Sequence, residues 1–222
     1  MFDRIKNAMN LRRAPPATQP QLQAWADARG LNLQGRKEGG FSLAGAWNGH
    51  LFRAECAPST RNYIRGFELK ARVELSVQPE VGLVLMNRAL KSTFEAQANA
   101  LFEDVTDPLE TRARQVPEEV RWLSLYRDAG WTGPPAGFWS RYAVLTDTAE
   151  VARESLNEAL VTQLMQWPAH QPEGAPMLYV LDSGSTYLRL QMDRSVSADV
   201  AVHALDVLGL FSAQVAKVLA PR

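Results

Sequence analysis

The sequence predicts an α+β protein in which helices pack on one face of a curved antiparallel sheet, and three observations support this prediction. Residues 67–77 alternate strictly between apolar and polar side chains, which is typical of a strand with one buried and one solvated face. Two tight-turn signals, Asn48-Gly49 and Ser183-Gly184, each lie between apolar runs and indicate hairpins. Residues 199–219 show a helical apolar pattern with only a narrow polar stripe, so this helix is expected to lie against the sheet.

The composition is that of an ordinary globular chain, and it argues against a nucleic-acid partner. Hydrophobic residues make up 46% of the 222 residues and charged residues 22%, a balance that supports a normal core. Lys and Arg together number 24, as do Asp and Glu, whereas a nucleic-acid binder usually carries a basic excess. The single cysteine, Cys56, excludes an internal disulfide and a cysteine-rich zinc site, and the three histidines are far apart. We therefore expect no metal and no cofactor.

Residues 1–19 are expected to form a flexible basic arm ahead of a single α+β domain over residues 20–222. Apolar residues fall at helical spacing beside Lys and Arg in this arm, and Pro15-Pro16 then ends any helix. An amphipathic anchor for a membrane surface or a partner is the alternative. Charges within the first six residues argue against a secretory signal, and polar residues within 199–219 argue against a membrane span. We expect a cytoplasmic protein.

The first half of the domain is predicted to be a helix over residues 20–29 followed by a four-stranded meander. A turn at Asn48-Gly49 pairs Phe41 with Cys56 and places both on an apolar face. Cys56 is therefore interpreted as a buried structural residue and not as a nucleophile. The four strands are predicted at residues 41–47, 50–56, 66–77 and 81–86.

Residues 87–137 are the least regular part, and we expect an aromatic-rich segment of short helices there. The second half is more orderly, and an acceptor side chain at Asp147 followed by Glu150 is typical of a helix start. Its elements are predicted as a strand at 138–145, a helix at 147–167 with a break near Ser155, a hairpin at 177–190 and a long helix that begins at Ser197 or Ser195 and runs to Leu219. Each half contains a tight hairpin and a helix, which allows two pseudo-equivalent halves, although the sequence shows no repeat.

Aromatic residues of the irregular segment are candidate binding residues. Trp122, Tyr126, Trp131 and Trp139 lie within 18 residues of one another, and Pro134-Pro135 stiffens the loop between them. Aromatic side chains are enriched in interfaces and apolar pockets, so these four are expected to form an apolar groove or the lip of a partner-binding site. The alternative is a packing cluster that holds the segment to the sheet.

The loop at residues 57–66 supplies a second set of candidates. Arg61, Tyr63 and Arg65 lie here between two predicted strands. Arg and Tyr are common in recognition surfaces, and loops often carry function. A solvated connector is the alternative.

The stretch LDSGST at residues 181–186 admits a catalytic and a structural interpretation. An apolar run followed by Asp-Ser-Gly-Ser resembles the active-site loop of aspartic proteases, in which two aspartates share a proton, and the resemblance would make Asp182 a catalytic carboxylate. The chain has no second Asp-Thr/Ser-Gly, and the residues after the motif are mostly one helix. A turn at Ser183-Gly184 instead pairs Leu181 with Thr186 and gives a consistent apolar face, so we interpret the stretch as a turn.

These observations favour a non-catalytic binding or interaction module. The alternative is a hydrolase whose site is assembled only in the fold, with Asp182 as its carboxylate. The succession of helix, strands, helix, hairpin and helix resembles the layout of secretion-type chaperones, small dimers that bind a partner chain across a sheet. The resemblance implies a protein partner, with a small apolar ligand as the alternative, and a homo-oligomer is compatible with either. The balanced charge departs from the acidic character usual in that group.

Overall fold

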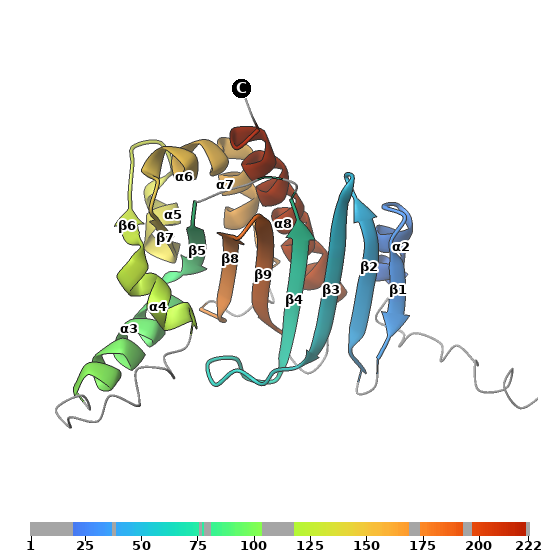
Figure 1. Ribbon diagram of the computed structural model, residues 1–222. Coiled ribbons are helices and arrows are strands. Elements are labelled where there is room, and N and C mark those ends of the chain that lie inside the picture. The colour runs from blue at the N-terminus through green and yellow to red at the C-terminus, as the bar shows by residue number, and fades with distance from the viewer. Residues whose placement is uncertain are drawn as a thin grey trace, which may run out of the picture.

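The part of the chain that the structure describes is built on one open antiparallel sheet of nine strands, in the order β1-β2-β3-β4-β9-β8-β5-β7-β6 (Figure 1). This computed structural model describes residues 20–36, 39–75, 77, 81–103, 118–168, 174–192 and 197–220, so the arm predicted at residues 1–19 lies outside the described residues. The strands are β1 (Asn32–Gly35), β2 (Phe41–Trp47), β3 (His50–Pro58), β4 (Phe67–Glu74), β5 (Leu83–Asn87), β6 (Arg127–Ala129), β7 (Tyr142–Thr146), β8 (Met177–Asp182) and β9 (Ser185–Met192). The helices are α2 (Pro20–Asp27), α3 (Arg88–Glu103), α4 (Glu118–Leu125), α5 (Ala136–Arg141), α6 (Ala149–Ser155), α7 (Glu158–Met165) and α8 (Ala198–Val218).

The N-terminal four-stranded meander is present and consists of β1 to β4. Asn48 and Gly49 have φ angles of 52° and 81°, so the turn between β2 and β3 lies where the Asn-Gly signal predicts it. The predicted register is confirmed, with Phe41 opposite Cys56. Cys56 is fully buried, and burial raises the pKa of its thiol to about 12, which suits a structural residue.

The strand predicted at residues 81–86 exists as β5, but its neighbours differ from the predicted ones. β5 pairs with β7 and β8. The strand that pairs with β4, where β5 was predicted, is β9. Every residue of β5 is buried, because both faces of this strand are covered. A strand that is apolar on both faces suits the middle of a sheet with helices on either side. The fourth strand of the meander is the short edge strand β1, which was not predicted because its residues show no sustained alternation of apolar and polar side chains.

The main helical layer covers one face of the sheet, as predicted. α8 packs against β9 and β4 and against α2, α6 and α7. Figure 1 shows α8 and α2 behind the strands. The core on this side includes Phe52, Leu69 and Tyr179 from the strands, with Leu205 and Phe211 from α8. By length and apolar composition α8 could cross a membrane, but its apolar side chains are used in this core.

Two helices, α3 and α4, lie on the opposite face, so the prediction of helices on one face alone needs a correction. They pack on β5, β7 and β8 in a second core. Val84 and Val180 belong to this core, whereas their chain neighbours Leu85 and Tyr179 belong to the main one. This arrangement explains why these strands are continuous apolar runs and do not alternate.

The strand predicted at residues 138–145 is divided between two elements. Residues 136–141 form α5, and β7 begins at Tyr142. The reason is local, because Pro135 stands at the N-cap of α5 with φ of −62° and its carbonyl accepts a hydrogen bond from the amide of Phe138. The prolines that were expected to stiffen a loop therefore also begin a helix.

The break predicted near Ser155 is confirmed, since α6 ends there and α7 begins at Glu158. Asn157 caps α7 by accepting a backbone N–H at 3.0 Å. The helix start predicted at Asp147 is off by one residue. Thr148 is the N-cap and makes no side-chain cap, while the Asp147 carboxylate accepts from the amide of Gly82 at 3.1 Å. Asp147 thereby links the end of β7 to the residue before β5.

The stretch LDSGST is a hairpin turn, as interpreted from the sequence. β8 and β9 pair with Leu181 opposite Thr186 and Asp182 opposite Ser185. Ser183 and Gly184 lie at the bend with left-handed φ angles of 47° and 71°. Asp182 is half-buried at the end of this hairpin.

Candidate binding surface

The structure divides the four aromatic candidates between two regions of the protein. Trp122 lies in the second core on α4, where 4% of its surface is exposed and its ring centroid lies 6.3 Å from that of Tyr187. Trp131 and Trp139 pack against the main core on the other side of the sheet. The four residues are therefore not brought together in one continuous groove.

Tyr126, directly after α4, packs against the second core, on the same side of the sheet as Trp122. Its ring covers Gly82, because a Cβ on Gly82 would lie 2.1 Å from the ring and its hydroxyl. Burial raises the pKa of the Tyr126 hydroxyl, and the negative charges of Asp182 and Asp147 raise it further. Tyr126 thus packs the connection after α4 against the start of β5, and only part of its ring reaches solvent.

Trp131 and Trp139 form a T-shaped pair with ring centroids 5.0 Å apart and an interplanar angle of 87°. Trp139 also meets the fully buried Phe138 edge-on at 5.0 Å. Both indoles are half-buried, and no described residue accepts a hydrogen bond from either indole N–H. The core therefore fixes one side of the pair, while the other side and its two donors remain available.

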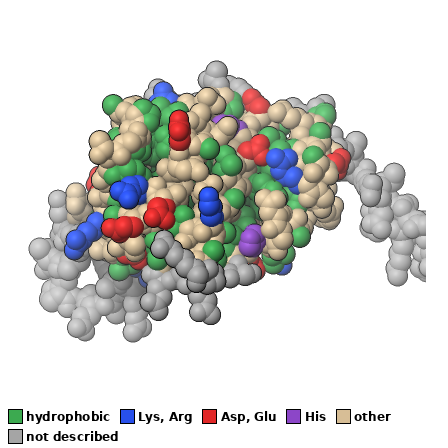
Figure 2. Space-filling view, turned by 90° about the horizontal axis from the view of Figure 1, so that it is seen from above, with side chains coloured by type: hydrophobic (Ala, Val, Ile, Leu, Met, Phe, Trp, Pro, Cys, Tyr) green, Lys and Arg blue, Asp and Glu red, His purple; other side chains and the backbone are tan. Residues whose placement is uncertain are grey.

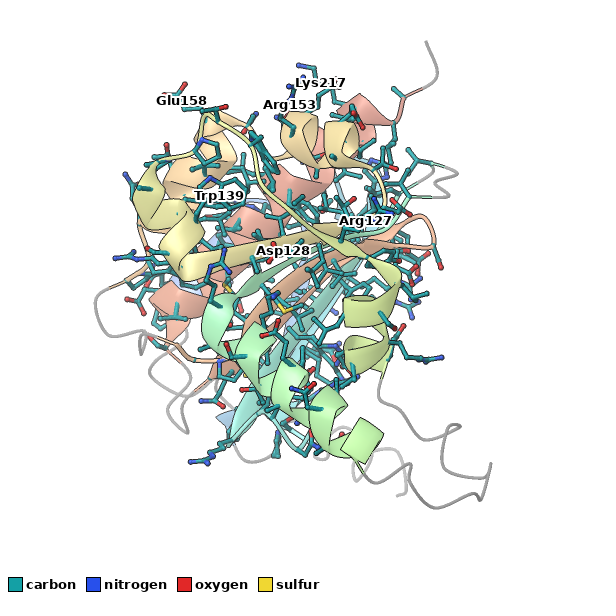
Figure 3. All side chains as sticks on the ribbon, turned by 90° about the vertical axis from the view of Figure 1, so that its left-hand side faces the viewer. Arg127, Asp128, Trp139, Arg153, Glu158 and Lys217 are labelled. Atoms are coloured by element: carbon teal, nitrogen blue, oxygen red, sulfur yellow. The ribbon has the colours of Figure 1, made fainter. Side chains whose placement is uncertain are left out.

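These tryptophans flank an open sheet edge. β6 ends the strand order, and among the described residues it pairs with β7 alone. Figure 3 looks onto this edge: Arg127 and Asp128 lie on β6 and Trp139 lies beside it, with α3 and α4 below, α6 and α7 above and α5 at the left. Lys91 of α3 holds the strand from one side, because its Nζ lies 3.5 Å from Asp128 Oδ2.

An exposed leucine precedes the same edge. Leu125, the last residue of α4, is 66% exposed; in the described part of the chain, Leu51 on β3 at 43% is the other exposed large hydrophobic side chain. Leu125 does not lie on the face of α4 from which Val120 and Leu123 pack into the second core. The helical spacing of the sequence alone could have shown this. Single exposed leucines are common, but this one stands two residues before an unpaired strand edge. Seen from above, acidic and basic side chains are interspersed among hydrophobic ones (Figure 2).

The second set of candidates, Arg61, Tyr63 and Arg65, is also divided. Arg61 forms an ion pair with Glu119 of α4, and the Tyr63 hydroxyl donates to Glu119 Oε1 at 2.9 Å. The Tyr63 ring meets Phe94 of α3 edge-on at 5.0 Å. Burial, together with the Glu119 carboxylate, raises the pKa of the Tyr63 hydroxyl. Arg65 stands apart with an exposed side chain.

The polar network around Arg61 continues onto the sheet. Glu68 of β4, which is 7% exposed, accepts a hydrogen bond from Arg189 of β9 at 2.8 Å and lies 3.7 Å from Arg61 Nε. The buried acids Glu68 and Glu119 are thus matched by two arginines, as burial of charge requires. No spacing in the sequence points to this network, because Arg189 lies 121 residues from Glu68 and Glu119 lies 58 residues from Arg61. Arg61 and Tyr63 hold the second helical layer on the sheet.

Among the described residues, no group of three or more His, Cys, Asp or Glu side chains could hold a metal ion. Asp182, the carboxylate of the hydrolase alternative, lies in a hairpin turn, and its geometry does not favour that alternative. The accessible features near β6 are the Trp131–Trp139 pair and Leu125, beside a strand edge that is unpaired among the described residues.

No protein-family model matches the chain, and no curated protein matches it. Among solved structures, the crystal structure of the mycobacterial trehalose monomycolate transport factor A, TtfA, is similar, with 13% sequence identity and a TM-score of 0.48 over 93% of this chain and 98% of that one. At that identity and score, no activity and no residue role is carried over.

Proposed function

We propose that this protein is a non-catalytic binding module that holds an extended segment of a protein partner along β6. The observation that supports the proposal is the half-buried Trp131–Trp139 pair beside an open strand edge. An edge strand presents unpaired N–H and C=O groups, with which an extended chain pairs as an added strand. The two indoles and Leu125 supply apolar contacts for alternate side chains of that segment.

β6 suits this role better than β1, the strand at the other end of the sheet. The side chains of Asn32 and Gln34 make the β1 edge polar and exposed. Tryptophans beside β6 instead offer a large, rigid contact area at a low cost in side-chain entropy. β6 is also three residues long and carries Arg127 and Asp128, features that disfavour indiscriminate pairing between copies.

Leu125→Asp is expected to weaken partner binding by about tenfold, because it places a desolvated charge where the partner's apolar side chains would lie. The probe is a set of short peptides selected from a displayed random library against the full chain. Their affinity is measured by fluorescence anisotropy, and hydrogen exchange locates the amides that they protect. The expected result is protection of residues 127–129 and loss of affinity in the variant.

Leu51→Asp is the matched control, since it changes the other exposed leucine, which lies on β3 and remote from β6. Its affinity for the same peptides should stay within about twofold of wild type. Equal weakening in both variants would contradict the proposed surface. So would protection that falls outside β6, or binding by a small apolar ligand alone.

A further inference from the structure

Two arginines stand directly opposite each other on the sheet face that α3 and α4 leave open. The register of β3 and β4 pairs Arg53 with Arg72. Both side chains are exposed and point away from the core that their neighbours Phe52 and Val73 enter. Figure 1 views the sheet from this face, with β2, β3 and β4 in front of α2 and α8.

Neither guanidinium has an acidic partner among the described residues. Arg72 Nη2 donates to Ser185 Oγ of β9 at 2.9 Å, and Ser185 is 4% exposed, so this hydrogen bond directs the guanidinium. Arg53 makes no ion pair within the described part of the chain. Like charges directly opposite across two strands destabilise a sheet, so the pair stands as an unneutralised positive site.

The nearby acids do not neutralise it. Glu55, two residues from Arg53 on β3, is held by Lys70 at 2.9 Å and by Arg36. The hydrogen bond from Lys70 is the main reason that the pKa of the Glu55 carboxyl is lowered. The Glu55 carboxylate is therefore paired with Lys70 and Arg36 and not with Arg53. Glu74, the next outward residue of β4, stands opposite Leu51 and forms no ion pair with either arginine.

An apolar shelf borders the arginine pair. Ala44 stands opposite Arg53 in the β2–β3 register, and Ala46 stands opposite Leu51. All three apolar side chains are exposed, and Leu51 reaches 43%. The open face therefore presents two cations next to a small hydrophobic strip.

We infer that this face docks an acidic, amphipathic segment of a protein partner. Guanidinium groups bind carboxylates through two parallel hydrogen bonds, so acidic side chains complement the arginine pair. The alanine and leucine strip beside it favours a segment that also carries an apolar side, which a free phosphate lacks. The surface lies on β2, β3 and β4, several strands from β6, and it stands whether or not β6 binds a partner.

The test uses the full chain and a helical peptide with a leucine stripe flanked by glutamates, beside a matched peptide with lysines in place of the glutamates. Wild type is expected to bind the acidic peptide at least about tenfold more tightly than the basic one. Arg53→Glu is expected to lose about tenfold in affinity for the acidic peptide. It should fold well, because a glutamate opposite Arg72 forms a favourable cross-strand pair, and Tm should rise by about 1–3 °C. Arg53→Gln provides a second variant without a charge reversal.

Arg65→Glu is the matched control, because it reverses the charge of an exposed arginine that lies in the loop between β3 and β4, outside their paired register. Its affinity for the acidic peptide should stay within about twofold of wild type. If Arg53→Glu and Arg65→Glu lost affinity for the acidic peptide equally, the inference would be overturned, because the binding would then depend only on the net charge of the protein. Unchanged binding in both Arg53 variants would also overturn it, as would Arg53-dependent binding of phosphatidylglycerol vesicles without binding of the peptide.

Discussion

Gly40→Ala is expected to destabilise the protein by about 2–3 kcal/mol. Gly40 is buried just before β2, and a Cβ at this position would lie 2.3 Å from the backbone carbonyl oxygen of Cys56 on β3. That oxygen belongs to the strand ladder, so it cannot move away as the end of a flexible side chain would. Urea denaturation of the two proteins measures the difference in the free energy of unfolding.

Gly35→Ala is the matched control for this prediction. Gly35 ends β1, one strand away, and a Cβ there would meet nothing within 4 Å. Alanine at Gly35 should be neutral or slightly stabilising, because glycine loses more backbone entropy than alanine when a strand forms. Equal stability of the Gly40→Ala protein and wild type would show that β2 and β3 do not approach as closely as described.

Glu119→Ala is expected to cost about 2–3 kcal/mol, because it removes one of the two buried acids that face Arg61 and the acceptor of the Tyr63 hydroxyl. The value lies below that for a fully buried pair, since the Arg61 side chain is 27% exposed. Loss of this contact should also loosen α4, so its amides are expected to exchange faster with solvent. Denaturation and hydrogen exchange measure the two effects.

Glu118→Ala tests whether the effect belongs to the network. Glu118 precedes Glu119 on the same helix, but it is exposed. Its loss removes only a favourable charge near the helix N-terminus, worth less than about 1 kcal/mol. If both alanine variants had the same stability and the same exchange rates in α4, the network would not be what holds this helix on the sheet.

The hairpins were predictable because their determinants are local. Asn48-Gly49 and Ser183-Gly184 supply left-handed residues at the bends, and the two-residue period of each strand then sets the register. The order of strands in the sheet was not predictable in the same way. β5 follows β4 along the chain yet pairs with β7 and β8, a choice that depends on both of its faces being apolar.

The candidate surface shows the same division between local and long-range information. The aromatic composition of residues 122–139 was evident, but the side of the sheet on which each ring lies depends on where α3 and α4 dock. Trp122 is buried in the second core when α4 docks on the sheet, whereas Trp131 and Trp139 remain half-buried near β6. The β6 strand itself escaped prediction, because three residues including Arg127 and Asp128 carry no strand pattern.

Fluorine NMR of the full chain with 5-fluorotryptophan at its six tryptophan positions tests the partner-binding surface most directly. The resonances are assigned by single Trp→Phe substitutions, and spectra are recorded with and without a peptide selected against the protein. Binding along β6 predicts that the resonances of Trp131 and Trp139 shift, while that of the buried Trp122 stays in place. A shift of Trp122 or Trp25 with those of Trp131 and Trp139 unchanged would contradict this placement.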